Sequence, residues 1–158
     1  NMKLSLNGAL TIGTEDGANI EIRDNVGAEN IFIFGNSTPQ VQDLRRSGYD
    51  PRSIYQNNAL LNETLNKIDG GFFCNTDRRR YHDIFNTLVN YGDHYLLLAD
   101  YADYLATQMR IDELFRTPDA WTRKAILNVA GMGSFSSDRT IREYAVDTWN
   151  MKHLLRKG

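Results

Sequence analysis

The run Ile31-Phe32-Ile33-Phe34, closed by Gly35-Asn36, is the clearest strand in the sequence and the strongest indication of the fold class. All four residues of the run are apolar, so both faces of the strand must be covered. Such runs are typical of the inner strands of a parallel sheet that carries helices on both sides. The short apolar run Ala9-Leu10-Thr11-Ile12-Gly13 predicts a second strand. We therefore expect an α/β fold with a few parallel strands.

The rest of the chain has the periodicity of successive helices, so the fold is predicted to be predominantly helical. Three short helices are expected, each ended by a glycine that can adopt a positive φ. They cover residues 3–7 before Gly8, residues 19–26 before Gly27 and residues 41–46 near Gly48. Apolar stripes at helical spacing follow in residues 60–68, 84–89, 101–115 and 141–149. The repeated Ala-Asp-Tyr triplets in residues 99–104 are interpreted as helix surface with tyrosine anchors.

A further helix start is expected at Thr117-Pro118-Asp119, which combines an N-cap, a first-turn proline and an acid near the positive end of the helix dipole. The core face of this helix is expected to consist of Trp121, Ile126, Leu127 and Ala130. Ser137 is the expected cap of the last helix.

Composition and charge exclude several classes of protein. The chain of 158 residues carries a net charge of −2, and its 18 basic and 20 acidic side chains are divided equally between the two halves, so a nucleic-acid-binding surface is not expected. No apolar run is long enough to span a membrane. Cys74 is the only cysteine, which excludes an internal disulfide and a cysteine-based zinc site, and we expect it to be a small, half-buried side chain. A cytoplasmic location fits these features.

The common catalytic and nucleotide-binding motifs are not met. Gly13 and Gly17 are not followed by the Gly-Lys-Ser/Thr of a P-loop. Gly131-Met132-Gly133 follows a helix and has Ser136 in place of a third glycine, so a turn between helices is expected instead of a dinucleotide site. The histidines lack metal-ligand spacing: His82, His94 and His153. The residues by themselves therefore indicate an α/β chain without an assigned reaction.

Two features predict that the chain is part of a longer polypeptide. The sequence begins at Asn1, which is not an initiator residue. The two predicted inner strands also leave sheet edges that partner strands from elsewhere must cover.

Residues 1–22 closely resemble the pyridoxal-phosphate segment of the α-glucan phosphorylases, the family of glycogen, starch and maltodextrin phosphorylases. The pattern of that family reads Met-Lys, two residues, Leu or Met, then Asn, and the chain meets it from Met2 to Asn7. The resemblance continues in order through residues 29–35, 48–51, 99–101, 121–123 and 135–139, so it covers essentially the whole chain.

The resemblance implies that Lys3 is the cofactor-binding residue, because it matches the lysine that forms a Schiff base with pyridoxal 5′-phosphate. This chemistry needs a primary amine that can lose its proton, as a half-buried lysine near cationic or apolar surroundings does. Asn7 and the turn Asp16-Gly17-Ala18-Asn19 match family positions and are expected to form scaffold around the cofactor helix. No other catalytic residue and no metal ligand is assigned.

The resemblance also implies the place of the chain in a larger fold. The chain would be the C-terminal portion of an α-glucan phosphorylase, within a Rossmann-like domain of a two-domain glucosyltransferase of the GT-B type. Residues 1–158 would be the C-terminal segment of the pyridoxal-phosphate-binding catalytic domain. Within it, residues 1–36 would hold the cofactor-lysine helix and the sheet strands, and residues 37–158 would form the helical remainder.

The implied reaction is phosphorolysis of terminal α-1,4-glucosidic bonds to glucose 1-phosphate with retention, in which the cofactor phosphate assists proton transfer. The implied partners are the α-1,4-glucan, inorganic phosphate, the remainder of the phosphorylase chain and a second copy in a homodimer. The glycine-rich Glu-Ala-Ser-Gly-x-Gly stretch of the family would precede Asn1 and is not part of this sequence. We therefore expect the 158 residues alone to be inactive. The alternative hypothesis is a noncatalytic helical interaction module that binds a partner through the stripes at 60–68, 84–89 and 141–149.

Overall fold

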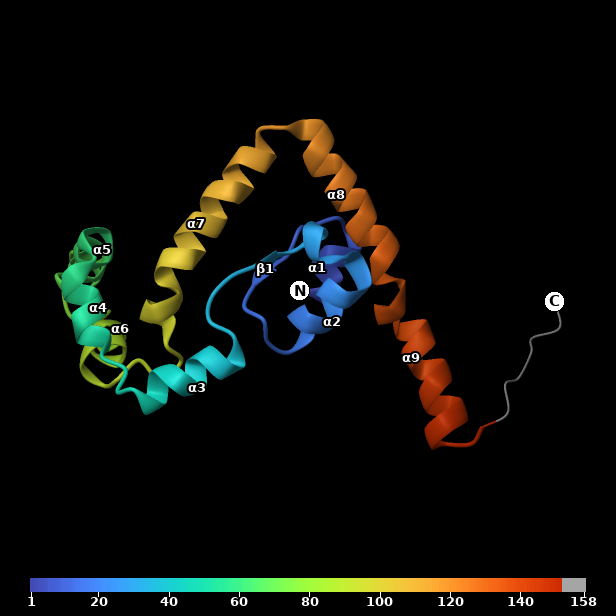
Figure 1. Ribbon diagram of the computed structural model, residues 1–158, viewed down its shortest axis with the longest axis horizontal. Helices are drawn as coiled ribbons and strands as arrows, with labels where there is room; N and C mark the ends of the chain where they lie inside the picture. The colour runs from blue at the N-terminus through green and yellow to red at the C-terminus, as the bar shows by residue number, and fades with distance from the viewer. Residues whose placement is uncertain (152–158) are drawn as a thin grey trace. The chain divides into compact units, whose positions relative to one another are not determined.

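The computed structural model describes residues 1–151, which fall into two compact units. Unit 1 consists of Asn1–Phe32 together with the described residues from Glu113 onward, and unit 2 consists of Ile33–Asp112. Figure 1 shows that helices dominate both units. The helices and one small parallel sheet are compatible with the expected α/β class.

Unit 1 brings the first thirty residues against the last long helix. Its elements are α1 (Met2–Leu6), β1 (Ile12–Gly13), α2 (Ala18–Val26), the 3₁₀ turn η1 (Ala28–Asn30), α8 (Pro118–Gly131), the 3₁₀ turn η3 (Met132–Phe135), α9 (Ser137–Glu143) and the π-helical turn η4 (Tyr144–Thr148). Its buried apolar core consists of Ile22, Val26, Ile31 and Met132. Gly131 lies where α8 passes α2, because a Cβ there would be 2.6 Å from the carbonyl oxygen of Asn25. Only a residue without a side chain allows the two helices this close.

The sheet pairs the two predicted strands over a shorter length than expected. β1 pairs with β2 (Phe32–Ile33), and the Phe32 N–H donates to the Thr11 carbonyl at 2.9 Å. Within residues 1–151, β2 pairs with β1 alone, and both of its residues are partly exposed. The prediction of an inner strand is therefore not met by the described residues, because the second neighbour that such a strand requires is not among them.

Unit 2 is built from helices around one apolar cluster. Its elements are α3 (Thr38–Arg46), α4 (Pro51–Asn57), α5 (Ala59–Asp69), α6 (His82–Phe85), the π-helical turn η2 (Asn86–Asn90) and most of α7 (Leu97–Phe115). Leu61, Leu65, Val89 and Leu98 form the buried centre of the cluster. The apolar stripes predicted at 60–68 and 84–89 supply three of these four side chains, so the helical periodicity of these segments is confirmed.

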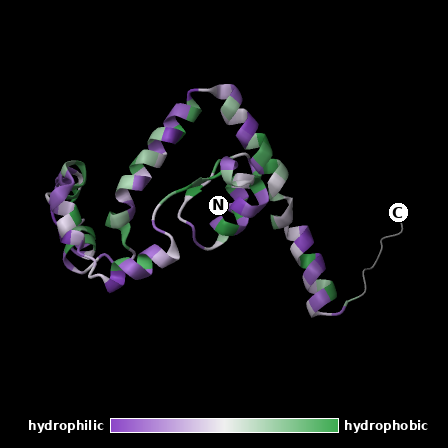
Figure 2. Cartoon of the chain, in the orientation of Figure 1, coloured by the Kyte–Doolittle hydropathy of each residue, from purple (hydrophilic) through white to green (hydrophobic). Residues whose placement is uncertain are grey.

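The predicted core face of α8 is wrong. Ile126 is 63% exposed and Leu127 is 41% exposed, whereas the buried side chain of this helix is Asn128. Figure 2 shows apolar and polar residues spread along α8, so its hydropathy does not define one buried face. Thr117 does occupy the N-cap position, but its side chain makes no capping hydrogen bond. The face of α8 that packs in unit 1 is selected by hydrogen bonds that apolar periodicity cannot reveal.

Two expectations for the C-terminal part also change. α9 begins at Ser137, so the N-cap is Ser136, one residue before the predicted cap. The stripe at 141–149 is mostly exposed: Ile141, Tyr144 and Trp149 are each more than half exposed. The Gly131-Met132-Gly133 segment is a turn between α8 and α9, as predicted.

No helix within residues 1–151 has the length and apolar character that crossing a bilayer requires.

Candidate functional site

Lys3 lies on α1, a helix of five residues near the start of unit 1. Its side chain is exposed, as are those of Leu4 and Leu6, whereas Ser5 is the one buried residue of the helix. No acidic side chain among residues 1–151 forms an ion pair with Lys3. The ammonium group of Lys3 is therefore open to a reagent from outside this part of the chain.

A buried hydrogen bond fixes the position of α1. The Ser5 hydroxyl donates to Asn128 Oδ1 on α8 at 3.1 Å, and neither side chain is exposed to solvent. Side chains two positions apart on a helix point about 200° apart, so burying Ser5 against α8 turns Lys3 away from α8. One polar contact therefore sets the orientation of the candidate cofactor lysine.

Asn128 connects this contact to two further backbone segments. Its Nδ2 donates to the Asn30 carbonyl at 2.8 Å and to the Lys124 carbonyl at 3.0 Å. The Asn30 side chain is also buried and donates to the Val26 carbonyl at 2.8 Å. Every polar atom of the Asn128 amide therefore has a partner, which buried amides require. This network joins α1, α8 and the end of α2.

The ends of α1 are held by asparagine side chains. Asn7 Nδ2 donates to the Lys3 carbonyl at 2.7 Å, so it closes the helix beneath the lysine. Asn1 Nδ2 donates to Asn19 Oδ1 at 2.8 Å, and Asn19 in turn donates to the Thr14 carbonyl at 3.0 Å. Asn7 and Asn19 thus contact the two ends of α1 and its N-cap residue, and their role as scaffold around a cofactor stays a prediction.

The described cations of unit 1 differ in whether they already form hydrogen bonds or ion pairs. Arg23 pairs with Glu15 and Asp24, and these hydrogen bonds raise the pKa of its guanidinium. Lys124 Nζ donates to the Glu29 carbonyl. A cofactor that carries both an aldehyde and a phosphate needs a free amine and additional anion-binding groups. Lys3 fits the first requirement, and among residues 1–151 we assign no group to the second.

Neither described histidine belongs to a metal site. His82 Nδ1 lies against Asp69 Oδ1, and the ring of His94 packs edge to face on Tyr95 with centroids 5.0 Å apart. Residues 1–151 contain no group of three or more histidine, cysteine, aspartate or glutamate side chains that could hold a metal ion. His153 lies outside the described residues.

Cys74 is half-buried, as predicted, in the loop between α5 and α6. Its Sγ lies 3.6 Å from Thr76 Oγ1. That hydrogen bond and the backbone N–H of Asp77 lower the pKa of the thiol. The thiol is therefore more readily ionised than its position in a loop alone would suggest.

The interpretation of residues 99–104 as helix surface is wrong for Asp100, whereas Asp103 is exposed and still has a tertiary partner. Asp100 is buried, and its Oδ1 accepts hydrogen bonds of 2.7 Å from the backbone N–H and the side-chain amide of Asn36. Asp103 Oδ2 accepts from the Gly35 N–H at 2.7 Å. The two carboxylates hold the loop that follows β2. A contact between side chains and backbone 64 to 68 residues apart leaves no local signal in the sequence.

Sequence reasoning also missed Ser5 and Asn128. A signal does exist at Asn128, because it interrupts the apolar run Ile126-Leu127 and Val129-Ala130 in the middle of a helix. Asparagine is unfavourable in a helix interior and is usually found there when its amide has partners. Its partners, however, lie 98 and 123 residues away, so only the folded chain identifies them.

The described chain matches known proteins along its whole length. The family model of carbohydrate phosphorylases matches residues 1–151. The chain is 51% identical over 152 residues to a glycogen phosphorylase of Synechocystis sp., and 49% identical over 152 residues to one of Haemophilus influenzae. It is 48% identical over 149 residues to the brain form of glycogen phosphorylase of Bos taurus. These matches cover 94–96% of this chain but only 18% of each relative, so the chain spans about a fifth of their length.

Proposed function

Because the chain belongs to the carbohydrate phosphorylase family, we propose that it is part of an α-glucan phosphorylase. The proposed reaction is phosphorolysis of terminal α-1,4-glucosidic bonds by inorganic phosphate, which gives glucose 1-phosphate with retention. The observation that carries this proposal is the match over residues 1–151 together with the Met2–Asn7 pattern around Lys3. The proposed partners are the glucan, inorganic phosphate, the remainder of the phosphorylase chain and a second copy of it, in the cytoplasm.

Lys3 is the proposed attachment point for pyridoxal 5′-phosphate, and its amine forms no ion pair among residues 1–151. Its side chain is exposed among the described residues, so the half-buried surroundings expected of a cofactor lysine would have to come from the remainder of the phosphorylase chain. When bound, the cofactor would supply a phosphate group that assists proton transfer to and from inorganic phosphate. The domain proposal follows from the same resemblance. Residues 1–36 hold the cofactor lysine and the strands of a GT-B type, Rossmann-like domain, and residues 37–158 form its helical remainder.

The residues around Lys3 fix its backbone and leave its amine accessible. Ser5 and Asn128 fix the rotation of α1 against α8, and Asn7 holds the backbone carbonyl of Lys3. Holding a reactive group in one orientation lowers the entropy that a reaction must otherwise lose. In this proposal the buried amide network is a positioning device, and among residues 1–151 Lys3 is the one residue assigned to contact the cofactor.

Borohydride reduction of the intact natural protein that contains this chain tests the proposal. A phosphopyridoxyl adduct on the peptide that contains Lys3, found by mass spectrometry, supports it. Lys67 is the internal control, because it is also exposed but pairs with Glu63 at 2.6 Å. A Lys3→Ala variant is expected to lose phosphorolysis of maltoheptaose. An unmodified Lys3 peptide in an active enzyme would refute the assignment.

The isolated chain of 158 residues provides a second test. We expect it to release no glucose 1-phosphate from maltoheptaose and inorganic phosphate, since the anion-binding groups that the cofactor needs are not assigned within it. The intact protein is the positive control. Phosphorolysis by the isolated chain would contradict this expectation.

The alternative function, a helical interaction module, loses most of its proposed surface. The stripes at 60–68 and 84–89 bury most of their apolar side chains in the cluster of unit 2, and only Leu60 and Ile84 of these stripes remain about half exposed. The stripe at 141–149 is mostly exposed. The phosphorylase proposal is therefore preferred.

A further inference from the structure

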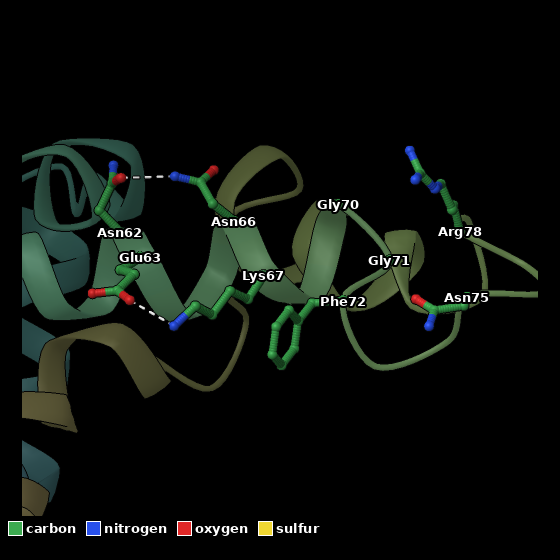
Figure 3. Close-up of a pocket in the computed structure, with 9 residues that line it drawn as sticks. All are labelled: Asn62, Glu63, Asn66, Lys67, Gly70, Gly71, Phe72, Asn75 and Arg78. Carbon is green, nitrogen blue, oxygen red and sulfur yellow. Dashed lines mark hydrogen bonds and ion pairs between the residues drawn. The ribbon is translucent and has the colours of Figure 1, made fainter.

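A hollow lies in unit 2 where the end of α5 meets the loop of residues 70–78, and Figure 3 shows the side chains around it. Its volume is about 610 Å³. Six of the side chains that line it are polar, charged or aromatic: Asn62, Glu63, Lys67, Phe72, Asn75 and Arg78. All of them belong to unit 2, whereas the candidate cofactor lysine belongs to unit 1. The hollow is therefore a separate feature of the chain.

The polar groups of this hollow include both donors and acceptors, and they carry little net charge. Lys67 Nζ donates to Glu63 Oε1 at 2.6 Å, which leaves Arg78 as the only lining cation without an ion pair among residues 1–151. The side chains of Asn75 and Arg78 also make no hydrogen bond with other residues in that range. An amide and a guanidinium together supply one acceptor and several donors. This set suits a neutral ligand rich in hydroxyl groups better than a polyanion.

An aromatic ring is exposed beside these polar groups. The Phe72 side chain is 65% exposed, although phenylalanine is usually buried. Phe73 supports it edge to face, with ring centroids 5.1 Å apart, and Lys67 Nζ lies 5.6 Å from the Phe72 centroid. Figure 3 shows Phe72 beside Lys67, with Asn75 and Arg78 on the neighbouring loop. The hollow thus combines one apolar surface with polar groups that surround it.

Glycines shape the wall between helix and loop. Gly71 has φ of +77°, and a Cβ there would lie 2.6 Å from the Arg78 Cα. A side chain at this position would force the loop away from the end of α5. The close approach keeps the backbone of Arg78 at the same hollow as Phe72. In Figure 3 the Phe72 ring and the Arg78 guanidinium extend to opposite sides of the Gly71 turn, so a ligand that contacts both must be longer than one sugar ring.

Sugars have the matching chemistry. A pyranose presents a face of C–H groups that can pack on an aromatic ring, and its hydroxyl groups both donate and accept hydrogen bonds. We propose that the hollow at the end of α5 binds a neutral oligosaccharide, a segment of α-1,4-glucan, with one sugar ring on Phe72 and hydroxyl groups on Asn75 and Arg78. The choice of an α-glucan among oligosaccharides rests on the proposed function. The hollow is open, so it suits the side of a polymer better than a small ligand that must be enclosed.

The test measures hydrogen–deuterium exchange of the intact natural protein with maltoheptaose and without phosphate. We expect maltoheptaose to slow exchange in residues 66–78 with a saturable midpoint. Phe72→Ala should raise that midpoint about fivefold, which corresponds to about 1 kcal/mol. Phe72→Trp should preserve binding. Asn75→Ala, in an exposed loop position, should raise the midpoint without loss of folded structure.

Phe115→Ala is the matched control. Phe115 is also 65% exposed and also packs edge to face on an aromatic ring, with centroids 5.1 Å apart, but it lies in unit 1. It should leave the midpoint within about twofold of the parent. Equal midpoints in Phe72→Ala and Phe115→Ala would overturn the proposal. So would protection of residues 66–78 by inorganic phosphate but not by maltoheptaose.

The results distinguish a failure of this oligosaccharide site from a failure of the proposed function. An adduct on Lys3 without protection of residues 66–78 overturns the oligosaccharide site and leaves the phosphorylase proposal intact. Protection that depends on Phe72, in a protein whose Lys3 cannot be labelled, supports the oligosaccharide site and removes the cofactor assignment.

Discussion

Replacing Asn128 with leucine tests whether the buried amide positions α1. The substitution preserves the approximate volume of the side chain but removes its hydrogen bonds to the Ser5 hydroxyl and the Asn30 carbonyl. Each buried polar group left without a partner costs about 1–3 kcal/mol. The Lys124 carbonyl keeps its backbone hydrogen bond within the helix. The greater hydrophobicity of leucine offsets about 1–2 kcal/mol of this loss in the free energy of unfolding. We expect a net loss of about 2–3 kcal/mol in the free energy of unfolding.

The assay is urea unfolding followed by far-UV circular dichroism, together with hydrogen–deuterium exchange of residues 2–8. Exchange in this segment should accelerate, because α1 loses its buried contact with α8. Asn57→Leu is the control, since Asn57 is an exposed helical asparagine whose amide reaches only the carbonyl and hydroxyl of Ser53 in its own helix. The control should change stability by no more than about 0.5 kcal/mol.

A double-mutant cycle with Ser5→Ala separates the direct contact from general damage. If the Ser5–Asn128 hydrogen bond positions α1, the two substitutions should be non-additive by at least about 0.5 kcal/mol. A stability of Asn128→Leu within about 0.5 kcal/mol of the parent, with unchanged exchange in residues 2–8, would refute the reasoning.

Three other predictions concern contacts elsewhere in the chain. Tyr49 donates to the buried Asp93 carboxylate at 2.7 Å, so Tyr49→Phe should lower the free energy of unfolding by about 1.5–3 kcal/mol in urea. Burial, and after it the hydrogen bond to Asp93, raises the pKa of the Tyr49 phenol. The phenol therefore contributes its full stabilisation below the unfolded pKa of about 10 and less at higher pH. The Tyr49→Phe variant should lack this decline. Gly131→Ala should destabilise the chain by about 1–3 kcal/mol through its clash with α2, whereas Gly133→Ala, with no atom within 4 Å of the added Cβ, should be nearly neutral in the same assay. Alkylation of Cys74 by iodoacetamide should have a pH midpoint below that of an ordinary thiol, because hydrogen bonds lower its pKa, and a midpoint at the ordinary value would contradict this.

Local features of the fold were largely predictable from the sequence. Glycines and apolar spacing located the short helices that became α1, α2 and α3, and both predicted strands pair. The apolar stripes of α5 and α6 packed as expected, because side chains three and four positions apart share one helix face whatever the rest of the chain does. Lys3 was singled out by its surrounding motif, and its role as the cofactor lysine stays a prediction.

The sequence by itself determined the family and the local elements, since motifs and periodicity are properties of neighbouring residues. The tertiary structure alone decided which polar groups are buried. Asn128 and Asp100 sit on helices whose apolar pattern points elsewhere, yet each is buried because it satisfies groups brought from more than 60 residues away. A polar side chain can be buried only where its hydrogen-bonding partners are present. Those partners come together only when the chain folds.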